Sequence, residues 1–245
     1  MKFTVIGGTG LIGSQVVRRL AEAGHEAVPA APSTGVDLLT GEGLDQALTG
    51  SDVVINVANS PTFDEASLDF FRTTTDNLLA AGERAGVGHQ VILSIVGVDQ
   101  VPDLAYYRAK VLQEDLLKQG PAPYSIVRAT QFFEFVDAIL SWSSDDTTVR
   151  LPATPLQPIA AADVVAAVVD VATGSPLNGV RDIAGPEVFP LDELGKITLA
   201  AQGDDRSVVT GGSGMFAAVP GDVLTAGPDA HLAPTRYQDW VARTR

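Results

Sequence analysis

A glycine-rich segment directly behind the first apolar run constrains the fold of this chain more than any other feature. Residues 7–13 read GGTGLIG and follow the apolar run at residues 3–6. An apolar-periodic stretch then runs from residue 11 to residue 20 and stops near Gly24. A strand, a glycine turn and a helix in this order are the setting in which such glycines bind a dinucleotide. We therefore expect a nucleotide-binding strand–turn–helix unit here.

Each glycine of this segment has its own physical task. Gly7 allows the tight turn off the strand, Gly10 lets the backbone approach a pyrophosphate, and Gly13 lets the helix pack close to the strand. The helix N-terminus adds free N–H groups and a partial positive charge. The predicted pyrophosphate-binding residues are Gly7, Thr9, Gly10, Leu11, Ile12 and Gly13.

Composition narrows the class of protein. The 245 residues carry a formal net charge of −14, which disfavours nucleic acid and anionic membranes as partners. The sequence contains no cysteine, its three histidines are isolated from one another, and it has no apolar run of membrane-spanning length. We expect a cytoplasmic protein without a metal site that acts on a small molecule, as a monomer or a homodimer.

Strand and helix patterns alternate through the first half. Near-continuous apolar strands that alternate with amphipathic helices are typical of a parallel sheet covered on both faces. The predicted strands are residues 26–30, 36–38, 52–57, 90–95 and 124–127, and the predicted helices are 42–48, 63–85 and 103–118. The expected fold class is α/β, a doubly wound parallel sheet (Rossmann fold).

The pattern loosens after Arg128. Helices are predicted at residues 131–140, 161–172 and 191–201, and a strand at 180–184. No linker-like boundary is visible, so we expect one domain over residues 1–245, in which residues from about 131 onward form a small C-terminal substrate-binding lobe. The aromatic residues at 132–142 favour a hydrophobic substrate.

A second group of residues carries acid–base chemistry. Tyr106 and Lys110 lie four residues apart on a predicted helix and therefore share one face. A nearby ammonium lowers the pKa of a phenol, and it can also hold a ribose hydroxyl. Ser94, at the carboxyl end of the preceding strand, can bind a substrate oxygen. We expect Ser94, Tyr106 and Lys110 to be catalytic, with Lys110 also contacting the cofactor.

With these motifs the chain resembles the short-chain dehydrogenase/reductase superfamily, in its atypical NmrA-like branch of NAD(P)-binding proteins. The resemblance rests on GGTGLIG at 7–13, on the Ser94, Tyr106 and Lys110 spacing, and on segments 124–132, 157–164 and 184–187. It implies that Ser94, Tyr106 and Lys110 match the catalytic positions. It also implies cofactor contacts for Val57, Ala58 and Asn59 beside the ribose, and for Ala129, Thr130 and Gln131 beside the nicotinamide.

Cofactor choice depends on the residues after the second strand. An acid there binds the adenosine 2′-hydroxyl and repels a 2′-phosphate, but residues 30–35 read AAPSTG. Ser33 and its neighbours can instead form a small anion-binding nest. This favours NADP(H) over NAD(H). Asp37, which follows shortly after, is expected near the adenine.

Three functions are compatible with these patterns. The leading hypothesis is an NAD(P)H-dependent oxidoreductase that transfers hydride to a carbonyl (ketone, aldehyde or quinone) of a small hydrophobic substrate while Tyr106 protonates the oxygen. An alternative is an NADP(H)-binding redox sensor without turnover, although the retained Tyr–Lys pair favours an enzyme. Another is a quinone or activated-alkene reductase that does not use Tyr106.

Overall fold

The computed structural model describes residues 1–212 and 215–244, which divide into two compact units. The first unit comprises Met1–Arg128 and Val164–Arg181, and the second comprises Ala129–Asp163 and Asp182–Arg245. The second unit begins close to residue 131, where the substrate-binding lobe was expected, and the role of that lobe stays a prediction.

The first unit alternates strands and helices along the chain. Its main elements are β1 (Lys2–Ile6), α1 (Leu11–Glu22), β2 (Glu26–Ala30), α2 (Leu44–Leu48), β3 (Val53–Asn56), α3 (Ala66–Ala85), β4 (His89–Ile95), α4 (Ala105–Gln119), β5 (Tyr124–Ala129), α6 (Ala161–Thr173) and β8 (Gly179–Ala184). Three of them, β5, α6 and β8, share residues with the second unit. Short 3₁₀ turns lie at η1 (Pro32–Thr34) and η2 (Val98–Gln100).

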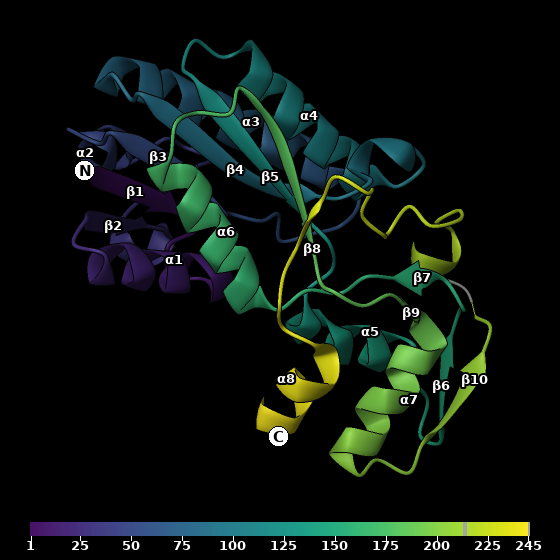
Figure 1. Ribbon diagram of the computed structural model, residues 1–245. Coiled ribbons are helices and arrows are strands. Elements are labelled where there is room, and N and C mark those ends of the chain that lie inside the picture. Colours follow the sequence, from purple (N-terminus) through teal and green to yellow (C-terminus); the bar gives the residue numbers. More distant parts are fainter. Residues whose placement is uncertain (213–214, 245) are drawn as a thin grey trace. The chain divides into compact units, whose positions relative to one another are not determined.

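These strands form a parallel sheet in the order β11-β8-β5-β4-β3-β1-β2, where β11 is the short strand His231–Leu232 beside the end of β8 (Figure 1). From β1 the chain moves outward to β2 and then returns to β3 on the other side. The strand order therefore reverses between β1 and β3. In open α/β sheets, ligands bind beyond the carboxyl ends of the strands at such a reversal.

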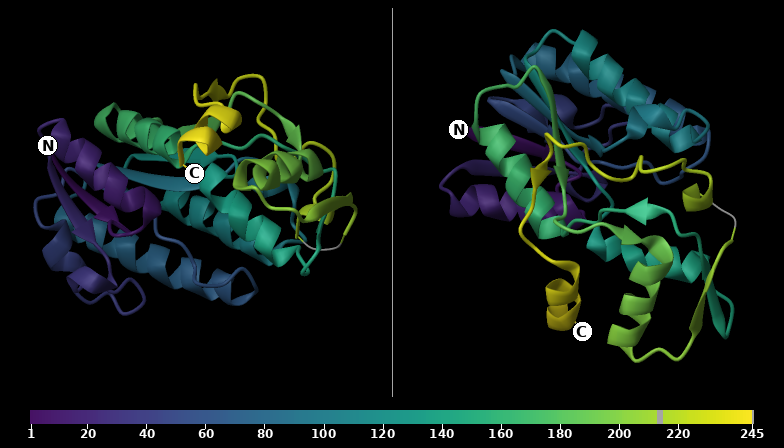
Figure 2. Two further views of the ribbon diagram at one scale, coloured as in Figure 1. Left: turned by 90° about the horizontal axis from the view of Figure 1, so that it is seen from below. Right: turned by 45° about the vertical axis from the view of Figure 1, so that its right-hand side comes forward.

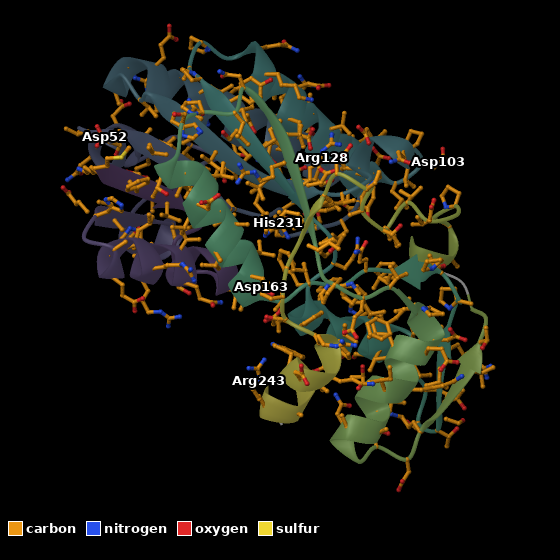
Figure 3. All side chains as sticks on the ribbon, in the orientation of Figure 1. Asp52, Asp103, Arg128, Asp163, His231 and Arg243 are labelled. Atoms are coloured by element: carbon orange, nitrogen blue, oxygen red, sulfur yellow. The ribbon has the colours of Figure 1, made fainter. Side chains whose placement is uncertain are left out.

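Helices cover both faces of the sheet. Helices α3 and α4 lie together on one face, whereas α1 and most of α6 lie on the other (Figures 1 and 2). The interior beneath α3 and α4 includes Ile92 of β4 and Ile126 of β5, which pack against Leu117 of α4. At the amino ends of β1 and β3, Asp52 accepts a hydrogen bond of 2.7 Å from the Lys2 amide (Figure 3). The predicted doubly wound Rossmann fold is confirmed.

One predicted strand is wrong. Residues 36–38 form no strand, because their amides bond locally: Val36 N donates to Ala31 O (3.0 Å) and Asp37 N donates to Glu42 O (3.0 Å). The apolar pattern arose because Val36 is buried in the core although it lies in a loop. Burial without strand pairing produced the false signal.

The second unit is built of shorter elements. They are η3 (Phe133–Phe135), α5 (Val136–Trp142), β6 (Thr148–Leu151), β7 (Pro155–Leu156), β9 (Phe189–Pro190), α7 (Leu191–Gln202), β10 (Ser207–Thr210), η4 (Met215–Ala217) and α8 (Tyr237–Thr244), with β11 as given above. Strand β10 pairs with β6 in parallel and β9 pairs with β7 antiparallel. The sequence patterns indicated α7 and β8, but none of the strands of four residues or fewer.

The helix predicted at 131–140 begins later than expected. Phe132 is extended and forms a bridge with Ile159, so the helical segment starts with η3 and α5. Behind it, Phe133 and Tyr237 pack edge to face with ring centroids 5.0 Å apart, and Tyr237 is fully buried. In residues 1–212 and 215–244, no helix combines the length and the hydropathy needed to cross a membrane.

Candidate cofactor and active site

The glycine segment forms a tight turn at the carboxyl end of β1. Gly7 has a φ of +76°, and its amide donates to Ala30 O at 2.8 Å. A Cβ on Gly13 would lie 2.1 Å from the Gly7 carbonyl oxygen, so the first turn of α1 sits directly on the strand end. Gly7 and Gly13 therefore have backbone positions that larger residues do not tolerate.

A glycine is also required at position 8, which the sequence patterns did not indicate. A Cβ there would lie 2.7 Å from both Pro29 Cα and Val5 O, which places Gly8 between β1 and β2. The signal was present as the second glycine of the Gly7-Gly8 pair, but spacing alone attaches no task to it.

Gly10 differs from these glycines because the protein itself leaves room beside it. A Cβ there would meet only Gly7 O, at 3.4 Å, and Thr9, Gly10 and Leu11 are all exposed. Gly10 caps α1, whose first amides have no partner within the helix. The bare backbone and the helix N-terminus together fit a dinucleotide pyrophosphate, with Ile12 and Gly13 buried behind them.

The turn after β3 lies against the glycine turn. Val57 N donates to Ile6 O at 3.0 Å, and the Ala58 amide nitrogen is 2.9 Å from the Cβ position of Gly7. These two turns flank the reversal of strand order. The expected ribose-side residues Val57, Ala58 and Asn59 therefore adjoin the predicted pyrophosphate site, and their contacts with a cofactor stay predictions.

The segment after β2 also reaches the glycine turn. The Ser33 hydroxyl lies 3.4 Å from the Thr9 hydroxyl, and Ser33 is exposed. Asp37 has a different use in the structure: its Oδ1 accepts from the Leu39 amide at 2.7 Å and so closes a local turn. Neither residue's predicted contact with a cofactor is tested by this geometry.

Tyr106 projects from the first turn of α4 toward the end of β3. Its hydroxyl donates to Asn59 Oδ1, and its ring packs against Phe63 and Phe71 at centroid distances of 4.9 Å and 6.0 Å. Burial raises the pKa of Tyr106 above that of a free phenol, against which the hydrogen bond with Asn59 acts in the lowering direction. The phenol is therefore protonated throughout the neutral range.

Lys110 is buried, and its ammonium has partners other than Tyr106. The Nζ atom donates to Leu93 O at 2.8 Å and to Gln113 Oε1, and it lies 4.8 Å from the Phe71 ring centroid. Burial lowers the pKa of Lys110 to about 7. Tyr106 and Lys110 share a helix face and a neighbour, Phe71, as their spacing predicts. Each polar head nevertheless has a separate partner.

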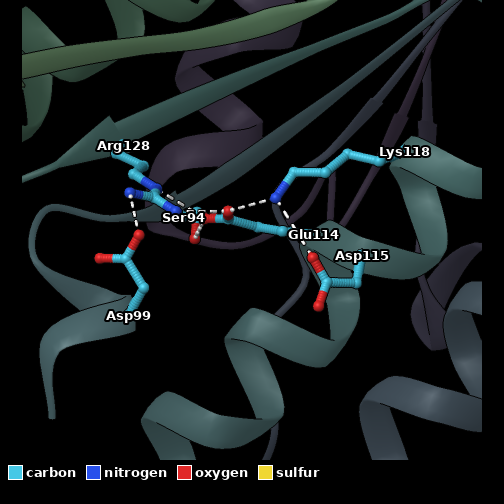
Figure 4. Close-up of polar contacts among 6 residues, drawn as sticks. All are labelled: Ser94, Asp99, Glu114, Asp115, Lys118 and Arg128. Atoms are coloured by element: carbon cyan, nitrogen blue, oxygen red, sulfur yellow. Dashed lines mark hydrogen bonds and ion pairs between the residues drawn. The ribbon is translucent and has the colours of Figure 1, made fainter.

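Ser94 belongs to a buried ionic cluster rather than to an open pocket (Figure 4). Its hydroxyl donates to Glu114 Oε1 at 2.6 Å, and Arg128 binds the same carboxylate through Nε at 2.8 Å and Nη2 at 2.7 Å. Asp99 contacts the same guanidinium at 3.2 Å. Hydrogen bonds and charge from Arg128 hold the pKa of Glu114 low despite its burial. Sequence reasoning missed Glu114 and Arg128, since a helix acid and a strand arginine carry no motif.

Within the second unit, two residues of the predicted nicotinamide segment leave buried polar atoms without partners. They are Thr130 Oγ1 and Gln131 Oε1, although the Thr130 amide donates to Ile183 O at 3.1 Å. Buried polar oxygens usually have hydrogen-bond partners, so the two atoms are suited to a ligand. Ala129, the third predicted residue, is buried at the end of β5.

Two acids of the second unit accept hydrogen bonds from backbone amides. Glu134 accepts from the Ala161 amide at 3.0 Å and so caps the start of α6, and burial raises its pKa. Asp163 (Figure 3) accepts from the Thr235 amide at 3.2 Å. The described residues contain no group of three or more metal-ligating side chains.

The family follows from a sequence comparison. Residues 7–174, most of the chain and including the glycine turn and α4, match the model of a family described as NAD(P)H-binding. The chain belongs to this family. The predicted resemblance to the NAD(P)-binding, NmrA-like branch of the short-chain dehydrogenase/reductase superfamily is confirmed at the level of this NAD(P)H-binding family.

Three characterised proteins are similar to the chain. The (4-alkanoyl-5-oxo-2,5-dihydrofuran-3-yl)methyl phosphate reductase of Streptomyces griseus is 29% identical over 209 residues, covering 77% of this chain and 70% of the relative. The divinyl chlorophyllide a 8-vinyl-reductase of Cucumis sativus is 28% identical, over 77% of this chain and 54% of that protein. Photosystem II assembly factor Ycf39 of Synechocystis sp. is 27% identical, over 55% and 46%. The chain thus spans about half the length of the latter two relatives.

Solved structures show the same fold. A nucleoside-diphosphate-sugar epimerase from Staphylococcus aureus superposes with a TM-score of 0.75, covering 99% of this chain and 100% of the epimerase at 15% identity. The family model describes NAD(P)H binding, and the names of two of the relatives describe reductases.

Proposed function

We propose that the protein is an NAD(P)H-dependent reductase that transfers hydride to the carbonyl carbon of a small hydrophobic substrate, with Tyr106 as proton donor. The observation that carries this proposal is the position of the Tyr106 hydroxyl. It donates to Asn59, three residues after β3, at the carboxyl ends of the strands where the glycine turn also lies. A proton donor is thus available beside the predicted cofactor site.

The chemistry divides between the cofactor and the chain. The reduced dinucleotide supplies the hydride when it is bound. Tyr106 would give its O–H proton to the substrate oxygen as the C=O π bond breaks and the new C–H bond forms at the carbonyl carbon, and the phenolate would then recover a proton from water. An alkoxide is a stronger base than a phenolate, so the raised pKa of Tyr106 still leaves the transfer favourable.

A second candidate is reduction of an activated carbon–carbon double bond. Ser94 and Lys110 make hydrogen bonds inside the first unit, with Glu114 and with Leu93 O, which leaves Tyr106 as the accessible member of the predicted trio. An alkene reductase needs no serine to hold a carbonyl oxygen. The vinyl-reductase name of one relative and the dihydrofuran named in another favour this reading.

We assign the cofactor preference to NADP(H). The segment after β2 offers a hydroxyl, Ser33, beside Thr9 of the glycine turn, and it presents no acid before Asp37, which closes its own turn. A 2′-phosphate is therefore not repelled there.

The test is a substrate panel followed by stopped-flow hydride transfer. Purified protein and NADPH are mixed with ketones, aldehydes, quinones and enones, and loss of NADPH absorbance identifies the best substrate. Tyr106→Phe should then lower turnover by roughly 10² to 10⁴ while NADPH affinity stays near wild type. Tyr107→Phe is the matched control, because the same hydroxyl is removed from a ring that is buried elsewhere.

The outcomes separate the candidate functions. A Tyr106→Phe protein that remains fully active on its best carbonyl substrate contradicts the leading proposal. Full activity restricted to enones or quinones in that variant supports the alkene reductase. Tight NADPH binding with no turnover on any class of compound favours a cofactor sensor, which has no turnover to lose.

A further inference from the structure

The hydroxyl of Tyr106 is held from outside its own helix. Asn59 is exposed and lies three residues beyond the end of β3, and its side-chain oxygen accepts the hydrogen bond from the phenol. Phe63 and Phe71 both pack against the same ring. The position of the hydroxyl therefore depends on the loop after β3.

Lys110 does not supply this positioning. Its Nζ donates to the strand carbonyl Leu93 O and to Gln113, both of which hold it in the interior. It shares only the Phe71 ring with Tyr106. A phenol that acts as an acid needs an oriented partner, and Asn59 is the polar side chain to which the Tyr106 hydroxyl donates within residues 1–212 and 215–244.

We infer that Asn59 is the positioning residue of Tyr106, holding the phenol as it donates its proton and stabilising the phenolate that remains. This inference rests on the proposed role of Tyr106 as proton donor.

A carboxamide is suited to both halves of that task. Its oxygen accepts from the neutral phenol, and after rotation its N–H₂ group donates to the phenolate. A carboxylate at the same position could perform only the first half, because it has no hydrogen to donate and repels the second negative charge. Substitution of Asn59 by Asp, which has nearly the same shape, therefore separates orientation from charge stabilisation.

A second tether to the same loop provides the control. Arg108, on α4, pairs with Glu65 at the end of the loop and donates to Pro102 O at 2.8 Å. Glu65→Gln weakens this tether but removes no group that touches the Tyr106 hydroxyl. Loosening of the loop and loss of the Asn59 carboxamide can thus be measured apart.

The decisive measurement is titration of the phenol itself. Difluorotyrosine is placed at position 106, where fluorination lowers the pKa into an accessible range, and ¹⁹F NMR follows its ionisation. Besides Asn59, the titratable groups beside the phenol are Tyr107 on the same helix, which raises the pKa of Tyr106, and Lys110, which shares the Phe71 ring with it. Both are unchanged in Asn59→Asp and in Glu65→Gln. We expect Asn59→Asp to raise the pKa of this phenol by about one unit or more, and Glu65→Gln to leave it unchanged.

Kinetics on the best substrate of the panel add a second readout. Asn59→Ala should lower kcat about tenfold at saturating NADPH with little change in cofactor Kd. In Asn59→Asp, the pH dependence of kcat should shift to higher pH, as the pKa of the phenol does.

Two results overturn the inference. One is an identical ¹⁹F titration in wild type and Asn59→Asp. The other is an Asn59→Ala variant that loses NADPH affinity but keeps kcat, which would make Asn59 a ribose contact only. The titration needs no turnover, so it remains decisive even if the panel finds no substrate and the proposed function fails.

Discussion

The glycine turn and the first turns of α4 are both predicted functional segments, yet they relate to the sequence in different ways. In the glycine turn, part of the constraint arises within a few residues, since Gly13 meets Gly7 O and Gly8 meets Val5 O; the remaining contacts are with the backbone of Pro29 and Ala58. On α4, Tyr106 and Lys110 bond groups 47 and 17 residues away. Local backbone geometry specifies the first segment, whereas tertiary partners specify what the second can do.

The largest effect should come from comparing two glycines of the turn. Gly13→Val places side-chain atoms where the Gly7 carbonyl oxygen lies, and we expect it to destabilise the protein by about 5 kcal/mol or more and to abolish NADPH binding. Gly10→Val meets little protein, so the fold should form while NADPH affinity falls by about 100-fold or more. Urea denaturation and fluorescence titration measure the two effects. An equal loss in the free energy of unfolding in both variants would contradict the assignment of Gly13 to packing and Gly10 to cofactor contact.

The next effect concerns the cluster around Ser94. Glu114→Ala leaves the Arg128 guanidinium, whose side chain is only 13% exposed, without its main partner. We expect a loss of about 3 to 5 kcal/mol in the free energy of unfolding. Asp115→Ala is the matched control one residue away, where an exposed ion pair contributes about 1 kcal/mol at most. Similar losses in the two variants would show that the buried cluster is not a structural element.

Lys110 should leave a pH signature on stability. Its pKa of about 7 in the folded state lies below the 10.5 of an exposed lysine, so between these pH values the unfolded state binds more protons. The free energy of unfolding of the wild type should therefore rise with pH across this window. Relative to wild type, Lys110→Met should lose about 3 kcal/mol between pH 7 and pH 9.5, at about 1.4 kcal/mol per unit.

Urea denaturation of both proteins at these two pH values measures the difference. If the free energy of unfolding has the same pH dependence in both proteins, Lys110 has no lowered pKa in the folded state. Its ammonium would then be charged at neutral pH, as the predicted contact with the cofactor ribose requires.

The smallest effect concerns cofactor choice beside the glycine turn. Ser33→Asp places a carboxylate next to Thr9, where it should repel a 2′-phosphate and accept from a 2′-hydroxyl. We expect the ratio of NADPH to NADH affinity to fall about tenfold, measured by fluorescence titration with each cofactor. An unchanged ratio would separate Ser33 from the ribose.

The alternation of apolar strands and amphipathic helices predicted most of the first unit, because its elements are long and their burial is periodic. The strand predicted at 36–38 failed because Val36 is buried in a loop whose amides bond locally. In the second unit, β7 and β9 have two residues each, too few for any periodicity to register.

The sequence by itself determined the βα unit with its glycine turn, because the positive φ of Gly7 and the contact of Gly13 with Gly7 O arise within the turn. It also determined that Tyr106 and Lys110 share a helix face, because helical periodicity is local. Only the tertiary structure decided that Asn59 accepts a hydrogen bond from the phenol, that Leu93 O accepts one from the Lys110 ammonium, and that Glu114 accepts one from Ser94 and pairs with Arg128. A buried polar group bonds whichever group the packing brings within about 3 Å, and the spacing of residues along the chain does not predict which group that is.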